Sequence, residues 1–247
     1  MFIKEDNYLL SVIIPTYNEQ NRIQQTIQDI STYFSQRPIR IELIIVDDGS
    51  KDNTLSILQK ECSSQSVPIT ILQNSKNRGK GYSIKRGMLH ANGEIRLFTD
   101  ADLSTPIDEY EKMAQALLKE DYDIAIGSRA LANSQKTIPQ NFVRDRMGKL
   151  FGYIVRWLLL PDIQDSQCGF KAFTAECAQQ IFPELTICRF GFDPELLCIA
   201  KKRKYRIKEV PITWENNFDS KFRPLSDPIN VGFDLFKFKI KSLLRKP

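Results

Sequence analysis

Short apolar runs alternate with helix-periodic segments up to about residue 130 of this 247-residue chain. Buried strands are predicted at 9–14, 41–46, 69–72, 95–99 and 123–127. Helices are predicted at 18–34, from 52 onward, at 82–91 and at 109–118. Strands and helices that alternate in this way form a mainly parallel sheet that is covered by helices on both faces. The predicted fold class is therefore α/β.

Polar clusters follow four of the predicted strands. They lie at 15–19, 47–50, 100–102 and 127–129. An open α/β sheet binds its ligand beyond the carboxyl ends of its strands. We therefore expect the four clusters to converge on one crevice that holds the functional site.

The third cluster, Asp100-Ala101-Asp102, places two carboxylates one residue apart at a strand end. Two such groups can share Mg²⁺ or Mn²⁺ and leave positions open for phosphate oxygens. The cation would neutralise charge that builds up on a leaving diphosphate. Two aspartates at this spacing are also common in surface loops, so the pair alone does not decide the function.

The first two clusters allow a structural and a functional interpretation. Residues 47–52 have the composition of a turn and a helix N-cap, so Asp52 can cap a helix while Asp48 binds a base or a ribose. The segment at 15–19 can end a strand and begin a helix. At a sheet crevice, Tyr17 can instead stack on a base and Glu19 can accept a hydrogen bond from it.

A basic turn that glycines interrupt lies at 77–81, directly before a predicted helix. Its spacing matches neither a Walker A motif nor a Rossmann fingerprint. The turn can bring Arg78 or Lys80 to a phosphate, or it can be an ordinary solvated turn.

The order and spacing of these motifs resemble the family-2 inverting glycosyltransferases with a GT-A fold. The matching segments are P-T-Y-N-E, V-D-D-G-S, G-K-G, D-A-D-L-S-T-P and G-S-R, in that order along the chain. Later segments at 165–171, 192–197 and 220–221 look like the dolichyl-phosphate β-glucosyltransferase branch, a relative of the dolichyl-phosphate mannose synthases. The resemblance runs from about residue 11 to about residue 241.

The resemblance implies a single domain over 1–247 with a Rossmann-like, mainly parallel sheet flanked by helices. A nucleotide-sugar-binding half would occupy about 8–130, and an acceptor-side half would occupy about 131–228. A C-terminal amphipathic helix would follow at about 229–247.

The resemblance also implies which residues contact the donor. The nucleotide-sugar-binding residues would be Pro15, Tyr17, Glu19, Val46, Asp48, Lys80, Asp100, Ala101, Asp102, Arg129 and Lys221. Of these, Asp100 and Asp102 would hold the metal, and Arg129 would contact the diphosphate as a fixed positive charge. Lys221 would reach over the donor from a loop.

Two positions depart from the mannose synthase pattern. Ser104 stands where those enzymes carry a glutamine, and Glu215 stands where they carry an arginine. A glutamate in place of an arginine would not hold the same donor in the same way. Both departures favour UDP-glucose over GDP-mannose.

The catalytic candidates on the acceptor side are Asp165 and Asp193. A hydroxyl nucleophile needs a carboxylate base within hydrogen-bond reach, whereas a phosphate nucleophile is already anionic and needs only to be oriented. Asp165 is placed first because it precedes a predicted strand at 168–174 that would lie near the donor. Asp193 precedes Pro194 and can equally be the N-cap of a helix.

Charge and cysteine content limit the compartment and the partners. The net charge of +5 is compatible with nucleic acid, an anionic membrane or phosphorylated substrates, and with the resemblance in view we expect no nucleic-acid partner. The five cysteines are widely spaced, which favours a reducing compartment. No apolar run reaches about 18 residues. We expect a cytoplasmic protein with peripheral contact, at most, on the cytoplasmic face of a membrane.

Two segments mix apolar and basic residues, at about 142–160 and 229–245. Each can pack one apolar stripe on the core, or present it to a lipid interface as an amphipathic helix does. Basic residues beside apolar ones suit a polyprenyl phosphate, which has an anionic head and an apolar tail.

The leading prediction is thus a hexosyltransferase that moves glucose from UDP-glucose to a polyprenyl phosphate. One alternative keeps the fold but uses GDP-mannose or another nucleotide sugar with a non-lipid acceptor. A second alternative is a non-catalytic nucleotide-sugar-binding protein, which the presence of both Asp100 and Asp102 disfavours.

Overall fold

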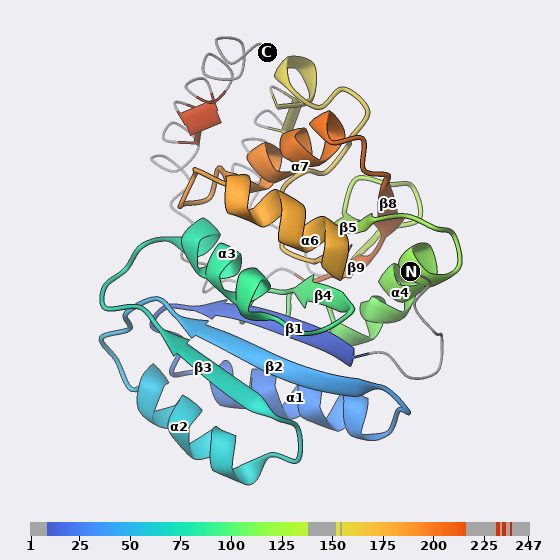
Figure 1. Cartoon of the computed structure of the whole chain (residues 1–247). Helices are drawn as coiled ribbons and strands as arrows, with labels where there is room; N and C mark the ends of the chain where they lie inside the picture. Colours follow the sequence, from blue (N-terminus) through green and yellow to red (C-terminus); the bar gives the residue numbers. More distant parts are fainter. Residues whose placement is uncertain are drawn as a thin grey trace.

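The computed structural model describes residues 9–137, 152–153, 155–215, 231–232, 234–235 and 238. Its main sheet has the strand order β3-β2-β1-β4-β7-β5-β8 (Figure 1). These strands are β1 (Leu9–Thr16), β2 (Arg40–Asp47), β3 (Ile69–Gln73), β4 (Ile95–Phe98), β5 (Ile124–Ser128), β7 (Lys171–Thr174) and β8 (Ile207–Pro211). Two short strands, β6 (Gln135–Lys136) and β9 (Thr213–Trp214), form a separate parallel pair.

The main sheet is parallel except at one strand. β1 pairs in parallel with β2 and β4, β2 with β3, and β5 with β8. β7 lies antiparallel between β4 and β5. The predicted mainly parallel α/β sheet is confirmed, and the strand predicted at 168–174 begins three residues later than expected.

Helices cover both faces of the sheet, as predicted (Figure 1). They are α1 (Ile23–Ser35), α2 (Thr54–Ser64), α3 (Lys80–His90), α4 (Tyr110–Leu118), α6 (Ala175–Ile181) and α7 (Phe192–Lys202), with 3-10 turns η1 (Ile107–Glu109) and η2 (Phe182–Glu184). Successive side chains of a strand point to opposite faces. On β1, Val12 and Ile14 pack with α1 and α4, whereas Ile13 packs beneath α3.

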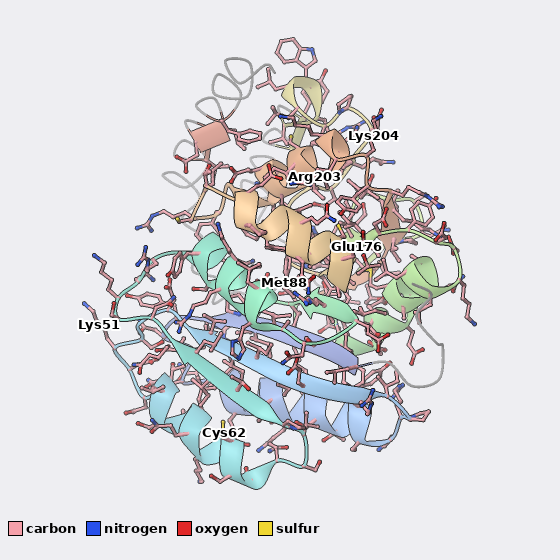
Figure 2. All side chains as sticks on the ribbon, viewed as in Figure 1. Lys51, Cys62, Met88, Glu176, Arg203 and Lys204 are labelled. Carbon is pink, nitrogen blue, oxygen red and sulfur yellow. The ribbon has the colours of Figure 1, made fainter. Side chains whose placement is uncertain are left out.

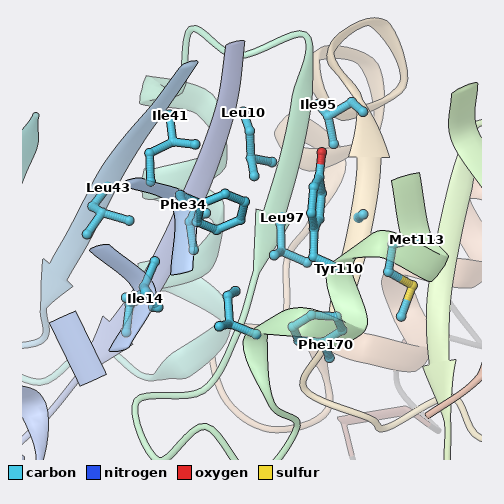
Figure 3. Packing of buried hydrophobic residues seen from close by; sticks show 14 of the residues in the cluster. Leu10, Ile14, Phe34, Ile41, Leu43, Ile95, Leu97, Tyr110, Met113 and Phe170 are labelled. Carbon is cyan, nitrogen blue, oxygen red and sulfur yellow. The ribbon is translucent and has the colours of Figure 1, made fainter. Parts of the chain in front are cut away.

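Figure 3 shows the first of these two cores, in which Phe34 and Tyr110 pack against the strand side chains. The second core joins α3, α6 and α7 to the other face, and it contains Met88, which Figure 2 labels on α3. No helix among the described residues is both long and apolar enough to cross a bilayer.

Two helix starts differ from the prediction. α1 begins at Ile23 instead of Asn18, because Asn18 has a φ of 54° and its side-chain oxygen accepts a hydrogen bond from Lys51 N. α3 begins at Lys80, two residues earlier than expected. The residue before it, Gly79, has a φ of 104°, and a Cβ there would lie 2.4 Å from the carbonyl oxygen of Cys188. Glycine is the residue that this backbone tolerates.

The chain after about residue 130 contributes strands β7 and β8 to the main sheet. Val231 and Leu235 pack in the same core as α7, so the part of the C-terminal amphipathic segment that is described puts one stripe on protein. Residues 142–151 and 154 of the first predicted segment, residues 229–230, 233, 236–237 and 239–245 of the second, and Lys221 lie outside the described residues.

Candidate active site

The polar clusters meet at one edge of the sheet, as predicted. β1, β2, β4 and β5 run in the same direction and end at Thr16, Asp47, Phe98 and Ser128. At this edge the chain leaves the sheet toward α2 and α3, on the left of Figure 1. The antiparallel β7 begins at the same edge, so residues 165–170 lie beside the ends of the parallel strands.

Asp100 and Asp102 follow β4 in a tight turn. The ammonium of Lys80, the first residue of α3, forms an ion pair with Asp100 Oδ1. Asp102 Oδ1 accepts a hydrogen bond of 3.0 Å from Ser104 N. Burial and the nearby Asp100 carboxylate raise the pKa of Asp102. A cation placed between the two carboxylates would favour the charged form of Asp102.

The backbone of Gly169 lies against the carboxylate of Asp100. A Cβ at Gly169 would be 2.0 Å from Asp100 Oδ2, so any larger residue would displace Asp100. This close approach places the loop before β7 against Asp100.

Lys80 is surrounded by acidic groups. Burial lowers the pKa of its ammonium, but Asp100, Asp193 and Asp102 together raise it above its usual value. The other candidate cation of the basic turn, Arg78, lies over the ring of Tyr82 with its guanidinium carbon 4.1 Å from the ring centre. Of the two residues that the sequence left open, Lys80 is therefore the one that faces the acids.

Arg129 and Asp165, predicted to have separate roles, are paired with each other. Arg129 Nε and Nη2 donate to the two carboxylate oxygens of Asp165 at 2.7 and 2.9 Å, and Arg129 N donates at 2.9 Å. Asp165 N in turn donates to Glu209 Oε1 at 2.9 Å. Burial alone would raise the pKa of Asp165, but Arg129 lowers it to about 2. A carboxylate held in this way is a weak base and a strong anchor for the guanidinium.

Replacing Asp165 with asparagine should cost stability that depends on pH. The folded-state pKa lies below the usual value, so the charged pair stabilises the fold fully above about pH 4 and loses that contribution as the pH falls toward 2. We expect about 2 kcal/mol at pH 7 and about half of that at pH 3. Urea unfolding of wild type and Asp165→Asn at both pH values measures the difference. Asp162→Asn, which removes an exposed carboxylate, is the control, and a difference that does not change with pH would contradict the assignment.

Asp193 is the second residue of α7, in the first turn of the helix, and is buried. Its interpretation as an N-cap is wrong, because the helix begins at Phe192 and Gly191 is the cap. The carboxylate instead binds the ammonium of Lys171, with Oδ1 2.5 Å from Nζ. Lys171 is fully buried, and its ammonium also donates to the carbonyl oxygen of Cys168 at 2.5 Å. Burial raises the pKa of Asp193, although Lys171 and Lys80 oppose that shift.

The carboxylate of Asp48 is also fully engaged within the protein. Asp48 Oδ1 accepts from Asn74 Nδ2 and Arg78 N, and Oδ2 accepts from Gly79 N, each at 2.8 Å. The carboxylate thereby fixes the loop that leads into α3. The prediction that Asp52 caps this helix is wrong by one residue, because Asn53 is the N-cap of α2; Asp52 Oδ1 accepts a 3.0 Å hydrogen bond from the N–H of Thr54, the first residue of the helix.

A polar pocket of about 690 Å³ lies beyond the ends of β1, β2 and β3. Tyr17 lines it, together with residues 49–51 and 73–77, and Lys51 marks this edge in Figure 2. The size is in the range of small-ligand sites. The neighbouring Pro15 is half-buried, and Glu19 forms an ion pair with Arg22 at 2.9 Å.

Val46, predicted to lie beside the base, does not line the pocket. It is fully buried under α3, where the methyl groups of Val46 pack beside Gly87. Any nucleotide contact at this position would come from the main chain. Ala101 is also buried, and its carbonyl oxygen accepts a 2.7 Å hydrogen bond from Thr26, which ties the metal motif to α1.

Sequence reasoning gave no role to Lys171, Gly169 or Asn74. Lys171 had a visible signal, because a lysine between Phe170 and the apolar pair Ala172-Phe173 must be buried if the segment is a central strand. The contacts of Gly169 and Asn74 had no such signal, since they depend on which loops meet in space.

Within the described part of the chain, no group of three or more His, Cys, Asp or Glu side chains is arranged to hold a metal ion. The residues that fit a divalent cation are Asp100 and Asp102, whose oxygens suit Mg²⁺ or Mn²⁺. The Lys80 ammonium already serves as a cation beside Asp100.

The mainly parallel sheet, flanked by helices and carrying one antiparallel strand, agrees with the GT-A fold that the sequence resemblance implies. Residues 11–182 match the model of glycosyl transferase family 2, and the chain belongs to this family.

Within this family, the chain is similar to several curated proteins that share one name. The chain is 36% identical to dolichyl-phosphate beta-glucosyltransferase of Dictyostelium discoideum, over 97% of this chain and 76% of the relative. It is 34% identical to the protein of the same name from Saccharomyces cerevisiae, over 97% and 77% of the two chains. The human protein of that name is 34% identical over 95% and 76%.

Solved structures agree on the fold. Mannosyl-3-phosphoglycerate synthase from Rubrobacter xylanophilus matches with a TM-score of 0.73 at 15% identity, over 97% of this chain and 76% of that one. Glucosyl-3-phosphoglycerate synthase from Mycobacterium tuberculosis, in complex with Mn²⁺, UDP and glucosyl-3-phosphoglycerate, matches with a TM-score of 0.63 at 18% identity, over 93% and 77%. At these identities the likeness establishes the GT-A fold alone.

Proposed function

We propose that this chain transfers glucose from UDP-glucose to a polyprenyl phosphate, with inversion at the anomeric carbon. The observation that carries the proposal is the pair Asp100 and Asp102 at the carboxyl edge of the sheet, facing Lys80. The names of the curated relatives support glucose as the sugar and dolichyl phosphate as the class of acceptor. The solved relative that holds UDP with Mn²⁺ supports the nucleotide and a divalent cation.

Asp100 and Asp102 would hold Mg²⁺ or Mn²⁺. When bound, the cation would neutralise the charge that builds up on the leaving diphosphate. Tyr17 and the loop residues of the adjoining pocket would receive the nucleoside, with the loop held in place by Asp48.

The transfer itself is a single displacement. An oxygen of the acceptor phosphate attacks the anomeric carbon from the face opposite the diphosphate. The bond between that carbon and the diphosphate oxygen breaks, and its electron pair leaves with UDP. Because the phosphate is anionic near neutral pH, the protein mainly has to orient it and does not need a strong base.

The acidic candidates divide between two roles in this scheme. Asp165 holds Arg129 through two side-chain hydrogen bonds, so it would act as a positioning residue for the guanidinium that would contact the donor diphosphate. Asp193 is close enough to Lys80 to raise the pKa of its ammonium, and it lies beside the metal motif on the β7 side. Asp193 is therefore our candidate for a carboxylate that acts near the reacting groups.

The two departures from the mannose synthase pattern lie next to each other. Glu215 N donates a 2.7 Å hydrogen bond to the carbonyl oxygen of Ser104, two residues after Asp102. An acidic side chain attached to the metal loop would disfavour a donor that needs an arginine there. This contact supports UDP-glucose over GDP-mannose.

The test is a donor screen with purified protein and polyprenyl phosphate. UDP-glucose with Mg²⁺ or Mn²⁺ should release UDP and form a glucosylated lipid, and saturating chelator should stop the reaction. Faster use of GDP-mannose would overturn the donor assignment. Equal transfer to water-soluble sugars would overturn the acceptor assignment, and nucleotide binding without any product would favour a binding protein.

Contact with a membrane is part of the proposal. Tyr153 and Trp157 are four residues apart in the sequence and are 67% and 76% exposed, while Val155 is buried. Arg156 is exposed beside them. Aromatic rings next to a basic side chain suit the interface of a lipid bilayer.

Replacing Trp157 with alanine should weaken binding to anionic liposomes by at least about tenfold, because a large apolar side chain contributes about 1.5–3 kcal/mol when it leaves water. Sedimentation with phosphatidylserine vesicles measures the bound fraction. His90→Ala, at an exposed position on α3, is the control. An unchanged partition of Trp157→Ala would remove Trp157 from the membrane-facing surface.

A further inference from the structure

Lys80 lies where a divalent cation would have to act. Its ammonium forms an ion pair with Asp100, while Asp102 and Asp193 are the other carboxylates that influence it. The lysine side chain is only 19% exposed, so these contacts are largely screened from solvent.

The backbone holds Lys80 at this place. Gly79 N donates to Asp48 Oδ2 at 2.8 Å, which fixes the residue before Lys80. Gly79 also lies against the carbonyl of Cys188, with no room for a Cβ. The side chain of Lys80, in contrast, is a flexible four-carbon stem whose head can change partners without any movement of α3.

A divalent cation and the ammonium cannot both stay on Asp100 at low cost. Two like unit charges about 4 Å apart repel by about 4 kcal/mol at the effective dielectric of a partly buried site, and the double charge of the metal makes this about 8 kcal/mol. The ammonium must therefore move when the metal binds. The donor supplies a new partner for it, because its diphosphate carries the negative charge that a lysine binds well.

We propose that Lys80 is a place-holding cation, which occupies Asp100 before the metal arrives and transfers to the donor diphosphate when metal and nucleotide bind together. The inference rests on the proposed metal site at Asp100 and Asp102. The movement of Lys80 from Asp100 to the diphosphate would make the binding of metal and nucleotide cooperative. Metal alone has to expel an ammonium that then has no anion to meet, whereas metal with nucleotide exchanges one ion pair for another.

Cooperativity of this kind is reciprocal, so it can be measured from either ligand. The affinity of Mn²⁺ is measured with and without UDP from the electron paramagnetic resonance signal of the free ion. The affinity of UDP is measured with and without Mn²⁺ by calorimetry. The ratio of the two affinities for one ligand is the coupling factor.

Lys80→Met removes the place-holding charge. We expect this variant to bind Mn²⁺ alone about tenfold more tightly than wild type and its coupling factor to fall about tenfold, within the usual range of coupling between sites. Lys80→Arg keeps a cation and should keep most of the coupling. Lys202→Met, which removes an exposed lysine in the last turn of α7, is the charge-matched control and should behave as wild type.

The possible outcomes distinguish a failure of the Lys80 exchange from a failure of the metal site at Asp100 and Asp102. If Lys80→Met binds Mn²⁺ no more tightly than wild type and keeps its coupling factor, the exchange is overturned while the metal site stands. If wild type takes up no Mn²⁺ even with UDP, both fall. Circular dichroism checks the fold of each variant, and Lys80→Gln replaces Lys80→Met if the latter does not fold.

Discussion

Replacing Asp102 with asparagine is expected to slow glucosyl transfer at least about a thousandfold, or about 4 kcal/mol in activation free energy. In the proposed mechanism this carboxylate shares the cation that stabilises the leaving diphosphate. An amide oxygen is a weaker ligand and carries no charge. The effect should therefore fall mainly on kcat, because the diphosphate gains negative charge in the transition state.

The amide preserves the local structure. Asp102 Oδ1 accepts a hydrogen bond from Ser104 N, and the side-chain oxygen of asparagine can accept the same bond. Asp108→Asn is the matched control, since it makes the same chemical change at an exposed position six residues further on. Initial rates with UDP-glucose at saturating Mn²⁺ should show no more than a small change in the control.

The Asp102→Asn variant should lose activity without losing stability. Burial and Asp100 raise the pKa of Asp102, which means that the charged form is disfavoured in the folded protein. Removing that charge should leave the melting temperature unchanged or raise it slightly, as is common when functional groups are held in unfavourable surroundings. Transfer at the wild-type rate by folded Asp102→Asn would refute the metal-dependent mechanism.

Much of the sheet could be predicted because strand position follows from local composition. The apolar runs at 9–14 and 41–46 became β1 and β2, with one or two residues added at their ends. The polar residues after them then had to lie at a common edge, because parallel strands end on the same side of a sheet. The place of Asp100 and Asp102 in the site followed from this rule alone.

The pairing of charges could not be predicted, because it depends on the order of strands in space. β7 inserts between β4 and β5, although 42 residues separate the end of β5 from its start (Ser128 and Lys171, with residues 129–170 between them). That insertion brings Asp165 to Arg129 and Lys171 to Asp193. Two candidate catalytic residues thereby acquired protein partners that no spacing in the sequence indicated.

The buried pair of Lys171 and Asp193 leads to the largest expected effect on stability. The side chain of Lys171 is fully buried. Asp193 Oδ1 and the carbonyl oxygen of Cys168 each lie 2.5 Å from its ammonium nitrogen. The ring of Phe98 lies 5.3 Å away. Removing one member of a buried ion pair leaves an uncompensated charge that costs about 3–5 kcal/mol. Lys171→Met should lose that much free energy of unfolding in urea.

The same change at an exposed pair on α7 provides the control. Lys201 binds Asp162 at 2.6 Å, with side chains 38% and 78% exposed. Exposed ion pairs contribute about 0–1 kcal/mol, so Lys201→Met should change stability by no more than that. A similar loss in both variants would show that burial is not what makes the Lys171 pair important.

The double variant Lys171→Met/Asp193→Asn separates stability from catalysis. Replacing both members of a buried pair by uncharged groups is often nearly neutral, so most of the lost stability should return. Transfer activity should not return with it if the Asp193 carboxylate acts near the reacting groups, as we propose. A double variant that regains both stability and transfer activity would assign Asp193 to the fold alone. A double variant that regains neither would show that Lys171 is needed for its packing and not for its charge.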